Sequence, residues 1–268
     1  MSKPRFSVIT PILNGREDVP GYVQCLQSQS YTNWEAIIVD DGSRDGSLEL
    51  LKRLTEDDPR FLITRNTLHK EIAGPYQARN VGLSLATGEF VCFLDIDDRW
   101  ISGKLTAQAG ILDVFPETKL LYSSYLRLRR GAVAGRIRRS STLQSPKRWI
   151  KIANPVPMLT ACVQRSMITG ITFKAQHHED YLFWHAVLRR LDHGQIRQDP
   201  SALAIYTIHD KSVSSNKLRA TYWIWQCYRC LGYGRPTASL ALLCRGILQA
   251  WLIASEAMQA KSSCHQLE

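Results

Sequence analysis

The sequence predicts an α/β protein with a mostly parallel central sheet, flanked by helices and followed by a helical C-terminal extension. Three observations predict this class. Over residues 1–115, apolar runs typical of buried strands alternate with segments of helical periodicity. Two of these runs pass directly into carboxylates, at Asp40 and at Asp95, as expected where parallel strands end at a ligand site. From about residue 218 onward the pattern is helical.

Local patterns predict each element of the first half. Apolar runs predict strands at residues 6–13, 36–39, 61–64 and 90–94. The run at 36–39 is continuous, which is typical of a strand covered on both faces. Apolar spacing predicts helices at residues 18–29, after residue 47 and at 76–86. Asp45 or Ser47 can cap the second of these helices, and Thr87-Gly88 ends the third.

The second half is less regular. Helices are predicted at residues 104–114 and 181–191, and strands at 119–125, 159–163 and 203–208. A basic loop is expected after residue 125. With 268 residues, 44% of them hydrophobic and 22% charged, the chain suits one large domain with an appendage.

The positive charge is concentrated in one segment. The net charge is +10, and residues 118–178 contain twelve Lys or Arg and no acidic residue. Such a segment attracts phosphates, whether of a nucleic acid, of anionic lipid head groups or of a diphosphate substrate. A solvated arginine-rich loop with no partner is the plain alternative.

Two features predict a protein that is made and kept in the cytosol. The amino terminus enters a strand-like run without the apolar core and cleavage site of a signal peptide. The seven cysteines are odd in number and scattered, which favours reduced thiols over a disulfide framework.

Carboxylates gather after two of the predicted strands. Asp95, Asp97 and Asp98 follow the run at 90–94, and Asp40 and Asp41 follow the run at 36–39. The three carboxylates of the first group would repel one another unless a cation or hydrogen-bond donors lay among them. Mg²⁺ and Mn²⁺ take carboxylate and phosphate oxygens, so a divalent metal site is predicted at this edge of the sheet.

Four motifs, in this order, resemble the family 2 glycosyltransferases of the GT-A fold. They lie at residues 7–14, 38–43, 78–82 and 87–98, and the resemblance extends over residues 5–215. It implies transfer of a sugar, a hexosyl or related group, from a nucleotide diphosphate donor with inversion at the anomeric carbon. It also implies dependence on Mn²⁺ or Mg²⁺.

The resemblance implies roles for the residues of these motifs. It assigns the base of the nucleotide to Asp41 and the support of that turn to Asp40. The residues that it assigns to nucleotide binding are Thr10, Pro11, Asn14, Asp40, Asp41, Arg79 and Asp97. The resemblance also makes Asp98, Asp97 and His209 metal ligands, while Asp95 reinforces the site. For Arg79, a salt bridge to one of the aspartates is the alternative. His209 is alternatively a phosphate donor or a simple loop residue.

The general base of an inverting transfer must take a proton from the acceptor hydroxyl. Glu179 and Asp180 open the predicted helix and resemble the Glu-Asp motif of the family. The resemblance makes Asp180 the base and gives Glu179 a part in acceptor binding. An acidic pair at a helix start is otherwise a cap that compensates the helix dipole.

The resemblance divides the chain into a catalytic domain at residues 1–217 and a helical extension at 218–268. Within the domain, residues 1–115 form the nucleotide-binding half and 116–217 the acceptor half. The extension is aromatic-rich and too polar for a confident membrane span, since Arg245 interrupts its apolar run. It is therefore either an interfacial helix at the cytoplasmic face of an anionic membrane or a helix packed on the catalytic domain.

The expected acceptor is a carbohydrate or lipid-linked saccharide used for cell-surface polysaccharide or glycolipid synthesis. A nucleotidyltransferase is one alternative, but it would require a glycine-rich basic loop after the first strand, and the segment there contains a single glycine, Gly15. A basic nucleic-acid-binding module is the other, and it rests on the arginines alone. No nucleic-acid partner is expected.

Overall fold

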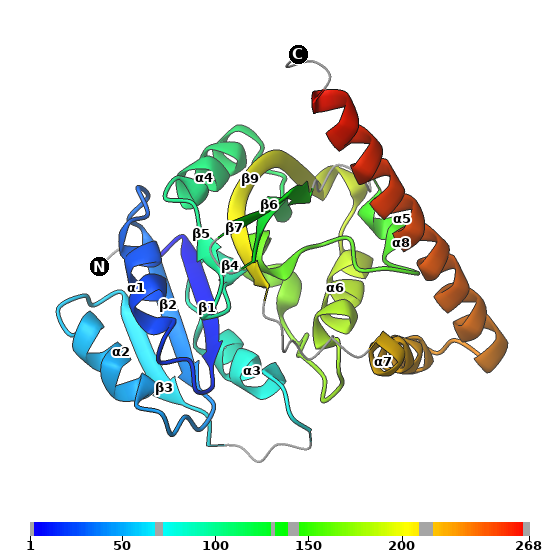
Figure 1. Ribbon diagram of the computed structural model, residues 1–268. Helices are drawn as coiled ribbons and strands as arrows, with labels where there is room; N and C mark the ends of the chain where they lie inside the picture. Colours follow the sequence, from blue (N-terminus) through cyan, green and yellow to red (C-terminus); the bar gives the residue numbers. More distant parts are fainter. Residues whose placement is uncertain (1–2, 68–71, 130–131, 139–144, 209–216, 265–268) are drawn as a thin grey trace.

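The computed structural model describes residues 3–67, 72–129, 132–138, 145–208 and 217–264 (Figure 1). These residues form a nine-stranded sheet in the order β3-β2-β1-β4-β8-β6-β9-β5, with β7 paired to β6. The pairs that join β3, β2, β1 and β4 are parallel, as is β6 with β9, whereas β5, β7 and β8 run antiparallel to their neighbours. The sheet is therefore mixed but mostly parallel.

Apart from one two-residue strand at Arg99–Trp100, which was not predicted, the elements of the first half lie close to their predicted bounds. The strands are β1 (Phe6–Ile12), β2 (Trp34–Asp40), β3 (Phe61–Arg65), β4 (Phe90–Phe93) and the short β5 (Arg99–Trp100). The helices are α1 (Val19–Gln27), α2 (Ser47–Thr55), α3 (Tyr76–Leu85) and α4 (Lys104–Val114).

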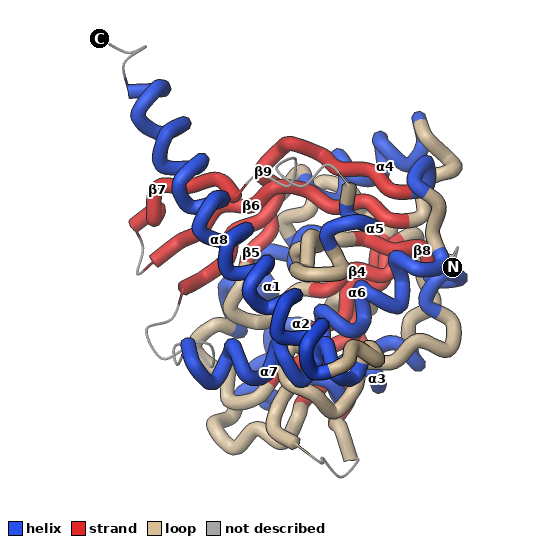
Figure 2. The backbone as a smooth tube through the Cα atoms, turned by 90° about the vertical axis from the view of Figure 1, so that its right-hand side faces the viewer, coloured by secondary structure: helices blue, strands red, loops and turns tan. Residues whose placement is uncertain are grey.

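The second half contains β6 (Leu120–Arg129), β7 (Ala132–Arg138), β8 (Cys162–Gln164) and β9 (Ile196–Ile208). Its helices are the short α5 (Pro146–Trp149), α6 (Glu179–Arg190), α7 (Lys217–Cys230) and α8 (Arg235–Cys264). Helices α7 and α8 form the C-terminal extension, and α8 runs outward from the body in both views (Figures 1 and 2). Among the described helices, none is both long enough and apolar enough to cross a membrane.

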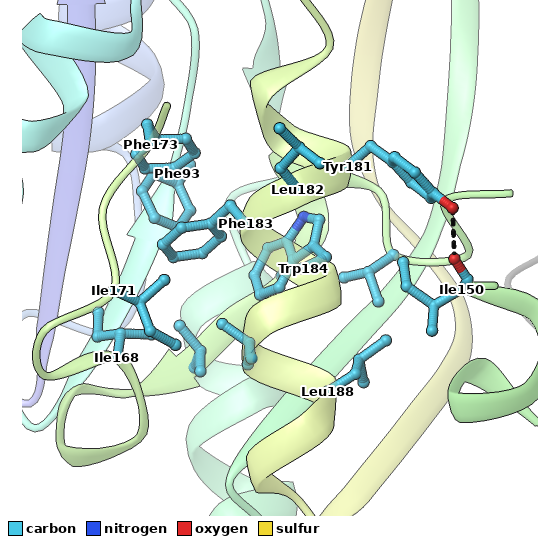
Figure 3. Packing of buried hydrophobic residues seen from close by; sticks show 14 of the residues in the cluster. Phe93, Ile150, Ile168, Ile171, Phe173, Tyr181, Leu182, Phe183, Trp184 and Leu188 are labelled. Atoms are coloured by element: carbon cyan, nitrogen blue, oxygen red, sulfur yellow. Dashed lines mark hydrogen bonds between the residues drawn. The ribbon is translucent and has the colours of Figure 1, made fainter. Parts of the chain in front are cut away.

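Two hydrophobic clusters cover the two faces of the parallel half. Side chains alternate along β1, so Val8 faces a cluster that includes α1 and α4, and Ile9 faces one that includes α3 and α6. This arrangement explains why the strands read as continuous apolar runs. On the second face, the rings of Phe93, Phe173 and Phe183 pack together beside α6 (Figure 3).

In the second half one prediction was wrong, and two predicted strands have different bounds. The expected basic loop is instead a hairpin, because β6 continues to Arg129 and β7 follows it. In the sequence of β7, Val133 and Ile137 fall at odd positions and Arg136 and Arg138 at even ones, a period-two pattern hidden by the basic composition. Strand β9 starts at Ile196, seven residues before the prediction. The strand predicted at 159–163 is a 3₁₀ turn, Met158–Thr160, followed by β8. The six described cysteines outside the final turn of α8 are free thiols, as predicted.

A glycine brings α3 close to the sheet. A Cβ at Gly82 would lie 2.4 Å from Cγ2 of the buried Ile9. Gly110, on α4, has no such neighbour within 4 Å. We predict that Gly82→Ala lowers the free energy of unfolding by about 1–3 kcal/mol, because a packed β-branched side chain cannot move aside. Gly110→Ala should raise it by up to about 1 kcal/mol.

Urea denaturation of the two variants checks this prediction, since both changes add one methyl group to a helix. Equal midpoints would contradict the close approach of α3 to β1.

Candidate active site

A cavity of about 400 Å³ opens at the carboxyl ends of β1, β2 and β4. Its lining comes from the turns after these strands and from the segment before α3. It includes Pro11, Ile12, Leu13, Asn14, Gly15, Asp18, Asp41, Gly74, Pro75, Asp95, Ile96 and Asp97. The sequence therefore placed both carboxylate groups correctly at one edge of the sheet.

Asn14 joins the turn after β1 to the turn after β2. Its backbone is left-handed, with φ of 53°, a conformation that asparagine tolerates better than most residues. Its side-chain oxygen accepts the N–H of Arg44 at 2.9 Å, and its own N–H donates to the hydroxyl of Ser43 at 2.9 Å. The two turns thus hold each other in place.

Asp40 and Asp41 have different environments. Asp40 is fully buried and accepts the N–H of Ser43 and the Nε of Arg65, both at 2.9 Å. Asp41 lines the cavity, and its Oδ1 accepts the side-chain amide of Asn66 at 2.9 Å. Asp40 therefore builds the turn, and Asp41 is the carboxylate presented to a ligand.

Thr10 does not line the cavity, contrary to the sequence prediction. It is fully buried within β1, and its hydroxyl is hydrogen-bonded to that of Tyr22 at 2.6 Å. Residues alternate across a strand, so Thr10 faces α1 while its neighbour Pro11 lies at the cavity.

The three carboxylates after β4 are held in three different ways. The side chain of Asp95 is 41% exposed and pairs with Arg79 at 2.8 Å. Asp97 lines the cavity, and its carbonyl accepts the hydroxyl of Thr207 at 2.6 Å. Asp98 is only 3% exposed and accepts the N–H of Thr207 at 2.9 Å. Strand β9 thus supports this turn from behind.

Burial of Asp98, together with the charges of Asp95 and Asp97, raises the pKa of its carboxyl well above the ordinary value. The N–H of Thr207 and the charge of Arg99 oppose this shift only in part. A cation beside these carboxylates would favour the ionised form of Asp98.

Arg79 connects the turn after β4 to the start of α6. Its side chain, on α3, is only 6% exposed. One guanidinium nitrogen donates to Asp95 at 2.8 Å, and another donates to Glu179 at 2.6 Å. The salt bridge that the sequence offered as the alternative role of Arg79 is therefore present. An approach of Arg79 to a bound donor stays a prediction.

Glu179 and Asp180 form the first turn of α6, after His178 in a left-handed conformation. Burial, followed by the charge of Asp180, raises the pKa of Glu179, although Arg79 acts in the opposite direction. The side-chain amide of Asn154 donates to Oδ2 of Asp180 at 2.9 Å. The sequence did not point to Asn154, because it belongs to none of the motifs.

The remaining metal prediction, His209, lies outside the described residues. Within the described part of the chain, no group of three or more His, Cys, Asp or Glu side chains is arranged to hold a metal ion. A site formed by Asp97 and Asp98 would therefore need oxygens from a substrate, which is usual for Mg²⁺.

Comparison with known proteins agrees with this geometry. The family model described as glycosyl transferase family 2 matches residues 7–170. The chain belongs to this family. Its membership confirms the resemblance seen in the motifs and makes the protein a glycosyltransferase rather than a nucleotidyltransferase or a nucleic-acid-binding module.

Two relatives of this glycosyltransferase match most of its length. It is 28% identical to the Escherichia coli UDP-Glc:alpha-D-GlcNAc-diphosphoundecaprenol beta-1,3-glucosyltransferase WfgD, over 82% of this chain and 83% of that protein. It is 30% identical to the putative teichuronic acid biosynthesis glycosyltransferase TuaG of Bacillus subtilis, over 85% and 88% of the two chains.

Solved structures confirm the GT-A fold. The TarS structure from S. aureus in complex with UDP-GlcNAc superposes with a TM-score of 0.68 at 19% identity, covering 90% of this chain and 71% of that chain. The mannosyltransferase PcManGT from Pyrobaculum calidifontis, in complex with GDP-Man and Mn²⁺, gives a TM-score of 0.65 at 19% identity, with coverages of 97% and 81%.

The shifted pKa of Asp98 predicts a pH-dependent stability. The folded chain holds this proton more tightly than the unfolded chain, so stability falls as the pH rises from the ordinary value of 3.8 through the raised folded value. In metal-free buffer at neutral pH, Asp98→Asn should therefore raise the free energy of unfolding by about 0.5–2 kcal/mol. The gain should vanish below pH 3.8.

Thermal unfolding with EDTA at a series of pH values tests this expectation. Asp57→Asn, at an exposed position, is the matched control and should change the free energy of unfolding by less than about 0.5 kcal/mol. A loss of stability in Asp98→Asn at neutral pH would contradict this prediction, because it would show that the partners of Asp98 outweigh the cost of burying its charge.

Removal of Arg79 should leave two partly buried carboxylates without a partner. We predict that Arg79→Met lowers the free energy of unfolding by about 3–5 kcal/mol, and that adding Asp95→Asn and Glu179→Gln recovers much of the loss. Arg197→Met removes a pair with Glu117 that is 32% and 51% exposed, and should cost about 1 kcal/mol or less.

Chemical denaturation of the single, triple and control variants gives these differences. An Arg79→Met variant as stable as the wild type would mean that the ion bridge does not hold the two segments together.

Proposed function

We propose that this glycosyltransferase uses a divalent metal to transfer a sugar, with inversion, from a UDP-sugar to a hydroxyl of a diphospholipid-linked acceptor. The observation that carries the proposal is the joining of the acidic cavity to Glu179 and Asp180 through Arg79. Relatives named as glucosyltransferases of diphosphoundecaprenol-linked saccharides, including WfgD and WfaP, support this donor and acceptor. The product would serve cell-surface polysaccharide synthesis.

The donor's nucleotide would occupy the 400 Å³ cavity. Asp41, held by Asn66, would accept hydrogen bonds from the N–H groups of the base. Pro11 and Asn14 would form the wall beside it, with Asp40 supporting the turn from below. These assignments follow the burial pattern, since Asp41 lines the cavity, whereas the buried Asp40 accepts hydrogen bonds from Ser43 and Arg65.

Asp97 and Asp98 fit a hard cation such as Mn²⁺ or Mg²⁺. They offer carboxylate oxygens, and burial, together with the charges of Asp95 and Asp97, raises the pKa of Asp98, so a cation would favour its ionised form. When bound, the metal would offset the charge that grows on the leaving diphosphate. Asp95 would keep its partnership with Arg79 and so fix the turn.

Asp180 would take the proton from the attacking acceptor hydroxyl. Asn154 holds its Oδ2 at 2.9 Å, and Oδ1 has no hydrogen-bond partner among the described residues. The carboxylate is therefore oriented with one oxygen available. Glu179, held by Arg79, would help to place the acceptor.

A transfer assay with Mn²⁺ tests these roles. UDP-Glc, UDP-GlcNAc and GDP-Man are tested as donors, with a soluble GlcNAc-diphospholipid analogue as acceptor. The two UDP-sugars should support turnover, and EDTA should abolish it. Asp180→Asn should lower kcat by about 10²–10⁴-fold while leaving the Kd for UDP unchanged. Asp41→Asn should instead weaken UDP binding.

The exposed Asp57→Asn is again the control, with wild-type kcat and Kd. NMR of the product identifies the anomer, and retention of the donor's configuration would refute inversion. Wild-type turnover in Asp180→Asn with a productive donor would remove Asp180 from the role of base.

A further inference from the structure

We infer that one face of α8 docks on an anionic lipid bilayer. Four large apolar side chains, termed here the α8 stripe, are exposed on this helix: Leu240 (60%), Leu243 (62%), Ile247 (63%) and Trp251 (55%). Their spacing of three, four and four residues places them along one face of the helix. The inference rests on the proposed function, since it concerns how the enzyme reaches a lipid-linked acceptor.

The α8 stripe is not the face by which the helix packs on the protein. Ala238, Ala241 and Leu248 are buried and lie on another side of α8, and the first two belong to the main hydrophobic cluster. Single exposed apolar residues are ordinary, but a continuous row of them indicates an interaction surface.

The charge around the α8 stripe favours an anionic surface as its partner. From residue 211 to residue 255 the sequence contains no acidic residue, while Arg219, Arg229 and Arg235 lie on α7 and α8. Each basic residue near an anionic bilayer strengthens binding to it. A second copy of this chain, with net charge +10, would instead bring like charges together.

The basic hairpin β6–β7 lies on the same side of the molecule as the outer part of α8 (Figure 2). Its strands carry Arg127, Arg129, Arg136 and Arg138. The backbone of this hairpin and that of the outer part of α8 therefore lie toward one side of the molecule in this view, as docking on a single surface requires.

The composition of α8 fits a helix that lies in the interface. Arg245 interrupts the apolar run of α8 on the side away from the stripe, and no described helix has the length and apolarity of a membrane span. Trp251 combines an apolar ring with an N–H, which suits the boundary between head groups and acyl chains.

Vesicle flotation of the full chain tests the inference. The wild type should bind vesicles of phosphatidylcholine with about 30% phosphatidylglycerol, and bind less in about 1 M than in about 0.1 M NaCl. Leu243→Gln, Ile247→Gln and Trp251→Gln, combined in one variant, should lower the partition coefficient about tenfold or more.

A matched control combines Leu54→Gln, Leu62→Gln and Val114→Gln, which replace exposed apolar residues on α2, β3 and α4. It should bind vesicles as the wild type does. The α8 variant should keep the wild-type unfolding temperature and UDP affinity, because its changes are at exposed positions.

The outcomes separate the inference from the proposed function. Equal vesicle binding by wild type and α8 variant, or no binding by the wild type, would overturn the docking surface. So would a wild-type dimer in sedimentation velocity that the α8 variant converts to a monomer, since the stripe would then contact a second copy. Vesicle binding without any nucleotide-sugar turnover would instead refute the proposed function and leave the docking surface in place.

Discussion

The buried guanidinium of Arg79 is the interaction on which the site depends. It lies on α3 and pairs with Asp95 after β4 and with Glu179 at the start of α6. Burying a charge is costly unless its partners are in place, so the two carboxylates and the cation must assemble together. The partners are 16 and 100 residues away along the chain, and the bridge thereby joins the parallel half of the sheet to the helix that carries Asp180.

This bridge leaves the turn after β4 only partly neutralised. Arg79 pairs with Asp95, whereas Asp97 and the buried Asp98 follow it in the same turn, and burial with the neighbouring charges raises the pKa of Asp98. A fold optimised for stability alone would replace one of them. Adjacent carboxylates lower the stability of the ligand-free protein, which is common at binding sites. A ligand that brings positive charge would relieve their repulsion and so bind more tightly.

The sequence predicted the parallel half well because its strands are buried on both faces, and such runs are visible without knowledge of their partners. The antiparallel half was harder, since β7 hides its alternation among arginines and β5 has only two residues. At the site, motifs pointed to Asp41 and Asp97, but Thr10 was misplaced because a motif does not state which face of β1 a residue occupies. Asn154 and the double pairing of Arg79 depend on contacts between distant segments, which no local pattern encodes.

The C-terminal extension contacts the segment that leads into the candidate base. The ring of His177 stacks on Trp223 with centroids 3.8 Å apart, and the thiol of Cys227 donates to the carbonyl of His177 at 3.3 Å. Gln176 and Gln226 add a hydrogen bond at 3.2 Å. Helix α7 therefore supports the turn at His178 from which Glu179 and Asp180 project, and α8 packs on α7. A surface that bound α8 would hold a helix pair already packed against the segment that leads into Glu179 and Asp180, so the attachment of the protein and the position of these two carboxylates would depend on the same helices.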